Sequence, residues 1–99
     1  MRIPETFSIG EKSYKVSLVQ SIGTKGIHGQ IHFPSGSILI AQSTSNKARD
    51  RTADEMTYTF LHEVTHAILE NMWHRSYKNE KLVTDFSRRL ASVVRTGGL

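Results

Sequence analysis

The chain has 99 residues, of which 37% are hydrophobic and 22% charged, with a formal net charge of +4 and no cysteine. These values predict a single folded domain over residues 1–99 and exclude both a disordered chain and two separate cores. Without cysteine there is no disulfide and no thiolate ligand, so a metal site would have to use histidine, carboxylate and water.

The apolar runs of the sequence are short, as at residues 38–41, and none is long enough to cross a membrane. The first seven residues include Arg2, Pro4 and Glu5 and lack the continuous apolar stretch of a secretory signal. We therefore expect a cytoplasmic protein without a membrane partner.

The first half of the chain has the alternating apolar pattern and the turn residues of short strands. Four strands are expected, at residues 7–9, 14–19, 30–33 and 37–40. Turns at residues 10–12 and 34–36 would make hairpins of the first and second pairs, because glycine or proline stands in each. Residues 22–29 and 42–51 are expected as loops, and the basic run 47–51 as a solvated one. The sequence thus predicts a small strand meander.

A long helix is predicted from Ala53 to about Met72. Thr52 can cap its first turn, and Glu55, three residues later, completes the pattern of a capping box. The apolar side expected to pack on the sheet is formed by Phe60, Val64, Ala67 and Ile68.

A second helix is predicted from Glu80 to about Thr96, with Asn79 as its N-cap. Its apolar face, expected to pack inward, is formed by Leu82, Val83, Phe86, Leu90, Val93 and Val94. The opposite face carries Lys81, Asp85, Arg88, Arg89 and Arg95. The predicted fold class is therefore α+β, with a small sheet packed on the first helix and a second, amphipathic helix after it.

The first helix contains the motif HExxH, formed by His62, Glu63 and His66. Residues four apart on a helix are separated by about 6 Å along the axis and about 40° around it, so both imidazoles project from one face. Two histidine nitrogens supply half of a tetrahedral zinc shell. Glu63 lies beside them, where a carboxylate can take a proton from a water molecule. The motif therefore predicts a zinc hydrolase, with His62 and His66 as ligands and Glu63 as the general base.

A catalytic zinc site usually has a third protein ligand, and the candidates are Glu70, His74, Glu80 and Asp85. Glu70 lies two turns from His62 and is better placed to accept a hydrogen bond from a ring N–H. Asp85 belongs to the polar face of the second helix. Glu80 begins that helix at the margin of its apolar face, which favours it as a ligand. The alternative for Glu80 is a solvent-exposed acid placed by the helix dipole.

The spacing after the motif excludes one class of zinc peptidase. Metzincins need a glycine three residues and a histidine six residues after His66, whereas Leu69 and Met72 occupy those positions.

Residues 59–69 and 79–86, together with the preceding strands, resemble the small ImmA/IrrE-like metallopeptidases common in phages and prophages, and also the minigluzincins. The resemblance implies a zincin-like domain with Zn²⁺ bound by His62, His66 and Glu80, and Glu63 as the general base. It implies a protein or peptide substrate, including regulators bound to DNA, and for a phage protein the cytoplasm of the host cell. Thr84 stands where thermolysin-like sequences have an aspartate four residues after the glutamate ligand.

Two other functions remain open at this point. The domain could bind zinc without cleaving peptides, or stay latent with its cleft blocked by its own C-terminal segment. Alternatively, the basic second helix could contact nucleic acid as part of a DNA-associated accessory protein, although such residues also simply solvate a helix surface.

Several further residues have two interpretations each. Tyr58 and Tyr77 either stabilise an oxyanion or pack, and packing is favoured for Tyr58. Trp73 is expected to anchor a helix end. For a peptidase, a sheet edge at residues 38–41 is expected to align an extended substrate.

Overall fold

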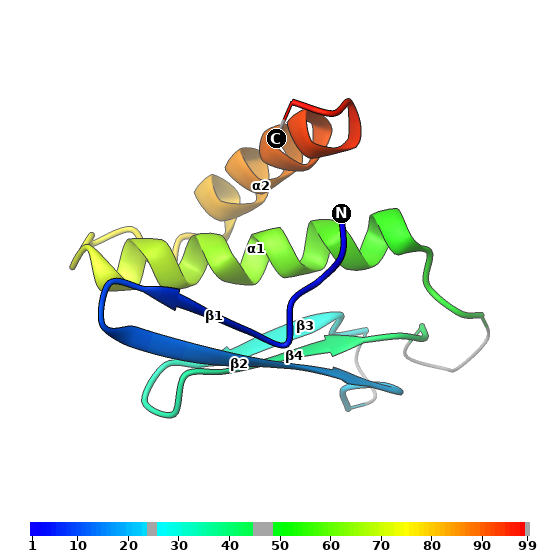
Figure 1. Cartoon of the computed structure of the whole chain (residues 1–99), viewed down its shortest axis with the longest axis horizontal. Helices are drawn as coiled ribbons and strands as arrows, with labels where there is room; N and C mark the ends of the chain where they lie inside the picture. The colour runs from blue at the N-terminus through cyan, green and yellow to red at the C-terminus, as the bar shows by residue number, and fades with distance from the viewer. Residues whose placement is uncertain (24–25, 45–48, 99) are drawn as a thin grey trace.

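A computed structural model of the chain describes residues 1–23, 26–44 and 49–98. The elements along the chain are β1 (Thr6–Ile9), β2 (Lys12–Val19), β3 (Gly29–His32), β4 (Ser37–Ala41), α1 (Ala53–Asn71) and α2 (Glu80–Arg95). The four strands form one sheet, α1 lies across it, and α2 lies on the far side of α1 (Figure 1). The predicted α+β class and the order of the elements are therefore confirmed.

The sheet is mixed and has the order β1-β2-β4-β3. The two predicted hairpins are confirmed, because β1 pairs antiparallel with β2 and β3 pairs antiparallel with β4. The prediction of a meander is wrong, since β2 and β4 are parallel neighbours. This arrangement places β4 inside the sheet and leaves β3 at one edge.

The core lies between the sheet and α1. Ile38 and Ile40 of β4 are fully buried, because they lie on the face of a central strand that packs against α1. Phe60 and Ala67 of α1 belong to the same cluster and Val64 packs against it, so the predicted packing side of the helix is confirmed for these three residues. It is wrong for Ile68, which is 39% exposed because it lies at the edge of the contact with the sheet. Each fully buried isoleucine contributes about 1.5–3 kcal/mol of hydrophobic free energy. The core therefore fixes the rotation of α1 about its axis.

The predicted caps of both helices are present. The Thr52 hydroxyl accepts from the backbone N–H of Glu55, whose carboxylate accepts from the backbone N–H of Thr52. The Asn79 side chain accepts from the backbone N–H of Leu82. These contacts satisfy N–H groups that have no partner within a helix, and so they set the first residue of each helix.

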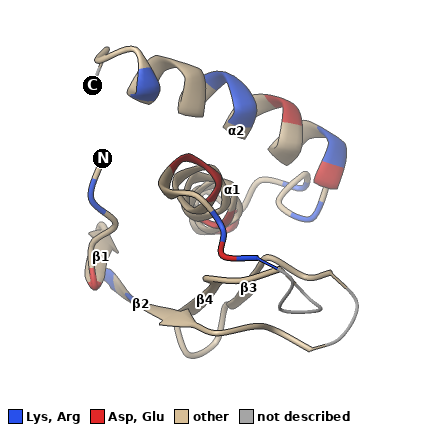
Figure 2. Ribbon diagram, turned by 90° about the vertical axis from the view of Figure 1, so that its right-hand side faces the viewer, with Lys and Arg blue, Asp and Glu red and all other residues tan. Residues whose placement is uncertain are grey.

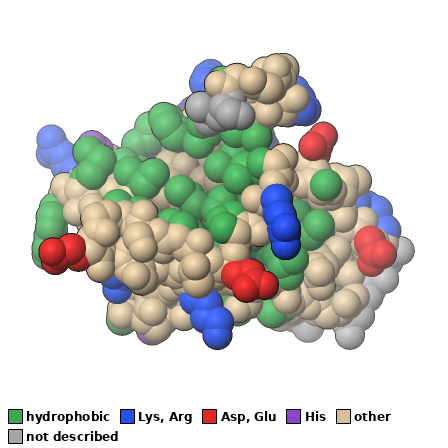
Figure 3. Space-filling model, in the orientation of Figure 1, with side chains coloured by type: hydrophobic (Ala, Val, Ile, Leu, Met, Phe, Trp, Pro, Cys, Tyr) green, Lys and Arg blue, Asp and Glu red, His purple; other side chains and the backbone are tan. Residues whose placement is uncertain are grey.

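The apolar face of α2 is only partly buried, which corrects the prediction. Val83 is fully buried, whereas Leu82, Phe86 and Val93 are 40–53% exposed. The reason is that α2 packs on α1 on the side away from the sheet (Figure 2), so no second layer covers the rest of its face. Hydrophobic side chains gather at the surface on this side of α1, below α2 (Figure 3). None of the described helices is long and apolar enough to cross a membrane.

A tight turn after α1 reverses the chain toward the start of α2. The N–H of Trp73 donates to the Glu70 carbonyl and that of His74 to the Leu69 carbonyl, the bonds of a Schellman motif. Trp73 holds the left-handed position of this turn, with φ at 56°, where glycine is usual. Its side chain is 95% exposed, so the prediction that it anchors the helix end is wrong.

The substitution Trp73→Gly is expected to stabilise the protein by about 1 kcal/mol, because glycine removes the steric cost of the left-handed conformation and no buried contact is lost. Urea-induced unfolding measures the change. Trp73→Ala keeps the strained conformation and is expected to leave stability within about 0.5 kcal/mol of wild type. Equal stability of the glycine and alanine variants would contradict this interpretation of the turn.

Candidate metal centre

Three of the predicted site residues converge at one end of the α1–α2 contact. The Nε2 atom of His62 lies 3.1 Å from Oε2 of Glu80, and the Nε2 atom of His66 lies 2.8 Å from Oε1. The two imidazole rings are 5.0 Å apart. One potential ligand atom from each residue lies within 4.8 Å of the other two. Sequence spacing aligned the two histidines, and the reversal of the chain before α2 brings Glu80 to them.

The hydrogen bonding of His66 defines which of its nitrogens can bind a cation. Its Nδ1 lies 2.6 Å from the backbone carbonyl of Tyr77, which can only accept, so Nδ1 carries a proton. In the neutral ring Nε2 then bears a lone pair, which faces a carboxylate oxygen of Glu80. Two acceptors at this distance repel unless a proton or a metal ion lies between them. The donor set therefore fits a cation held by nitrogen and oxygen ligands.

His62 is supported differently. Its Nδ1 is buried and has no hydrogen-bond partner among the described residues. Burial lowers the pKa of the His62 imidazole below its ordinary value, while the Glu80 carboxylate acts in the opposite direction. The ring is thus biased toward the neutral form, which is the form that ligates metal ions. A carboxylate often orients a metal-binding histidine by accepting a hydrogen bond from its second ring nitrogen. Within the described part of the chain, no carboxylate makes this bond to His62 Nδ1.

The segment between the helices is positioned by aromatic contacts. The Tyr77 ring packs edge-on against Phe33, which follows β3, with centroids 5.4 Å apart. Lys78 Nζ lies over the Tyr77 ring, 5.4 Å from its centroid. Tyr77 therefore ties the end of the β3 strand to the turn, and its carbonyl reaches His66 as a consequence. Its role here is packing and a backbone hydrogen bond.

Glu63 lies on the sheet side of α1 and is 6% exposed. Burial, with a smaller contribution from the Glu80 charge, raises the pKa of Glu63 to about 7. A carboxyl group with this pKa can both accept and release a proton near neutral pH. The backbone of β3 approaches it closely, because a Cβ atom placed on Gly29 would lie 2.8 Å from Oε2 of Glu63.

A cleft of about 400 Å³ joins these groups. It is bounded on one side by the metal-ligating candidates and Glu63, and on the other by β3 and the following residue: Gly29, Gln30, Ile31 and Phe33. The prediction that residues 38–41 form the substrate-binding edge of the sheet is wrong, because β4 lies between β2 and β3. The edge beside the site is β3. Within the described chain, no residue after Glu80 lines this cleft.

Arg51 joins the end of β4 to the first turns of α1. Its guanidinium donates to the carbonyl of Ala41 at 2.9 Å, to the carbonyl of Glu55 at 3.1 Å and to the hydroxyl of Thr59 at 2.6 Å. A longer contact, 3.4 Å, reaches the carbonyl of His28 just before β3. The prediction of a solvated basic loop is therefore wrong for Arg51, which is 6% exposed. Lys47 and Ala48 of that run lie outside the described residues.

The other third-ligand candidates, Glu70, His74 and Asp85, do not belong to the group of converging ligand atoms. Glu70 makes no described hydrogen bond to either ring, and the Tyr77 carbonyl takes the place predicted for it. His74 accepts from the backbone N–H of Ser76 in the turn. Asp85 pairs with Lys81 on the outer side of α2. Tyr58 packs edge-on against His62, with centroids 6.0 Å apart.

Comparison with protein-family models, curated proteins and solved structures finds no match to this chain.

The substitution Gly29→Ala is expected to lower the free energy of unfolding by about 1–3 kcal/mol through overpacking. The new Cβ would lie 2.5 Å from Cγ2 of Thr59, whose hydroxyl is held by Arg51 and by the Glu55 carbonyl, so this side chain cannot rotate away. Urea-induced unfolding measures the loss. Gln30→Ala, at the exposed neighbouring position, serves as control, with a change within about 0.5 kcal/mol. Equal stability of both variants would show that β3 does not press on α1.

Proposed function

We propose that this protein is a zinc-dependent peptidase. The observation that carries the proposal is the meeting of both histidine Nε2 atoms with the two oxygens of one carboxylate. A second buried carboxylate, Glu63, shares their cleft. These are the ligand types of a catalytic zinc site, with three protein groups and room for one further ligand.

More narrowly, we propose a peptidase of the gluzincin type. Two histidines from one helix and a glutamate from the next form the ligand set of that class, and the motif resembles that of the small ImmA/IrrE-like enzymes. The zincin-like fold is part of this proposal. The structure supports it through the order of the elements, in which a sheet edge and a second helix flank the helix that bears the motif.

His62, His66 and Glu80 would hold the ion. When bound, Zn²⁺ supplies Lewis acidity, which polarises a peptide carbonyl and makes a coordinated water more acidic. The Nδ1–H of His66 keeps its hydrogen bond to the Tyr77 carbonyl in this arrangement, so the ring does not need to change tautomer. Glu80 is 69% exposed in its side chain and so lies at the open rim of the site.

Glu63 would be the group that transfers protons during the reaction. Its carboxylate would accept the proton of the attacking water and later deliver it to the leaving amine. The approach of Gly29 limits where this carboxylate can move, since a larger residue at that position would contact it. Glu63 is thus held in the cleft without being one of the three convergent ligands.

The edge strand β3 would align the substrate. Its outer side has no strand partner among the described residues, and it lines the cleft opposite the histidines. An extended peptide can add to such an edge through main-chain hydrogen bonds. The natural substrate class is then an extended segment of a protein or peptide.

The test combines zinc stoichiometry with hydrolysis of an unfolded protein such as casein. Wild type is expected to bind one zinc per chain and to cleave casein, with activity lost in a chelator and restored by zinc. Glu63→Gln is expected to keep the zinc and lose at least about a hundredfold in rate, because general base catalysis contributes about 10²–10⁴-fold.

Glu80→Gln and Glu70→Gln form the matched control pair, since both remove one carboxylate near the helix ends. The first is expected to weaken zinc binding at least about tenfold, and the second to leave it unchanged. Failure of the wild-type protein to bind zinc would contradict the proposed function. Retention of full activity by Glu63→Gln would contradict the role of Glu63.

A further inference from the structure

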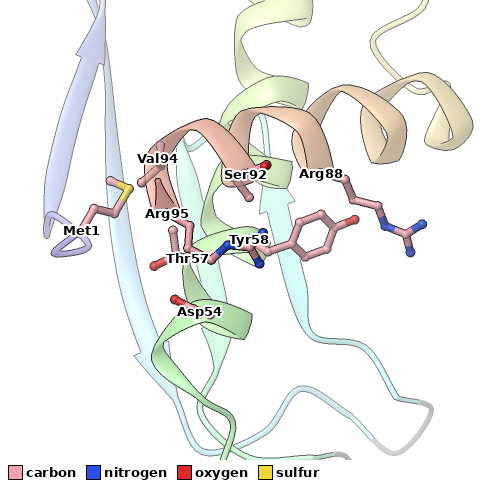
Figure 4. Close-up of a pocket in the computed structure, with 9 residues that line it drawn as sticks. Met1, Asp54, Thr57, Tyr58, Arg88, Ser92, Val94 and Arg95 are labelled. Carbon is pink, nitrogen blue, oxygen red and sulfur yellow. The ribbon is translucent and has the colours of Figure 1, made fainter. Parts of the chain in front are cut away.

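A second pocket lies between α1 and α2, and along α1 it extends from one to about two helical turns before His62. Its volume is about 320 Å³. The polar side chains that line it come from both helices (Figure 4), namely Asp54, Thr57 and Tyr58 from α1 and Arg88, Ser92 and Arg95 from α2. The groups described so far for metal binding and proton transfer do not include these residues.

The pocket and the metal centre belong to one stripe of α1. Asp54, Tyr58, His62 and His66 follow at intervals of four residues, so each lies beside the next along the helix surface. Tyr58 lines the pocket and also packs against the His62 ring, with centroids 6.0 Å apart. Asp54 is eight residues from His62, about 12 Å along the helix axis. The pocket therefore begins beside His62, at Tyr58, and extends away from the metal centre toward Asp54.

The two arginines that line the pocket are not held in ion pairs with other described residues, and the charge of Arg88 acts on Asp85 only beyond salt-bridge distance. Within the described chain neither Arg88 nor Arg95 forms a salt bridge, and neither donates one of the described hydrogen bonds. The cations on the outer side of α2 differ, because Lys81 pairs with Asp85 and Arg89 donates to the Asp85 carbonyl. Asp54 on the opposite wall offsets one of the two positive charges, so the side chains of the lining keep a net charge of +1.

We propose that this pocket is a substrate subsite for a carboxylate of the peptide, either the side chain of Asp or Glu or the C-terminal carboxylate. The inference rests on the proposed peptidase function and deepens it by naming a substrate class. A guanidinium binds a carboxylate through two parallel N–H groups, and such charge-assisted bonds are stronger than neutral ones. The hydroxyls of Tyr58 and Ser92 can donate to the same group.

The distances limit where that carboxylate stands in the substrate. An extended peptide advances about 3.3 Å per residue, so a span of about 12 Å corresponds to roughly four residues. The carboxylate is therefore within about four residues of the bond at the metal centre. A peptide with Gln in place of Glu would lose the charge but keep nearly the same shape.

The experiment measures peptide binding to the full chain carrying Glu63→Gln, which prevents turnover. Fluorescein-labelled Ala/Ser decapeptides contain one Glu or one Gln at each position in turn, with an amidated or a free C-terminus. Fluorescence anisotropy gives the dissociation constant with zinc and again in a chelator. At the best position we expect the Glu peptide, or the peptide with a free C-terminus, to bind at least about tenfold more tightly than its neutral counterpart. The two arms distinguish a side-chain carboxylate from a terminal one.

The variant Arg88→Gln/Arg95→Gln is expected to abolish that difference. The matched control, Lys81→Gln/Arg89→Gln, also removes two positive charges, but from the outer side of α2. It is expected to keep the difference in affinity between the acidic and the neutral peptide. Equal binding of acidic and neutral peptides, no binding of either, or an equal loss in the control pair would overturn the proposal. The measurement in a chelator separates the two claims. A protein that binds no zinc would refute the proposed peptidase, whereas the ratio of the dissociation constants of the Glu and Gln peptides would still report on the pocket.

Discussion

The hydrogen bond between the His66 ring and the Tyr77 carbonyl is the contact on which the candidate site depends. It fixes the proton on Nδ1 and leaves Nε2 facing Glu80. It also joins α1 to the segment that leads into α2, so the same bond that sets the tautomer brings Glu80 to the histidines. Because Tyr77 packs on Phe33 after β3, the edge strand belongs to this arrangement as well. The candidate metal ligands, the cleft wall and the helix reversal are thus coupled through Tyr77.

The position of α1 between two layers explains how so short a chain exposes a reactive face. The sheet covers the side with Phe60 and Ala67, and α2 covers the side with Thr65, whose hydroxyl accepts from Ser87. Between these two contacts lies the stripe that carries both histidines. Its neighbour Glu63 is close enough to the sheet to be buried and close enough to the cleft to line it. Burial therefore changes the proton affinity of Glu63 without removing it from the site.

Local signals in the sequence predicted the helices well. Thr52 and Asn79 marked both helix starts, because a side chain that caps N–H groups acts within three residues, and helical phase aligned His62 with His66. The strand order was predicted wrongly, since pairing of β2 with β4 is a non-local choice that hairpin signals do not encode. The Tyr77 carbonyl was missed because a backbone acceptor has no sequence signature. The burial of Arg51 was missed because its partners are backbone carbonyls and one hydroxyl.

The most direct test of this account is the state of the His66 ring, measured by long-range ¹H–¹⁵N NMR correlation near pH 7.5 with and without one equivalent of zinc. The account predicts a neutral ring with the proton on Nδ1 when zinc is bound, and a zinc-induced shift of the Nε2 resonances of both His62 and His66. A ring protonated on Nε2 in the presence of zinc, or Nε2 resonances that zinc does not move, would contradict it.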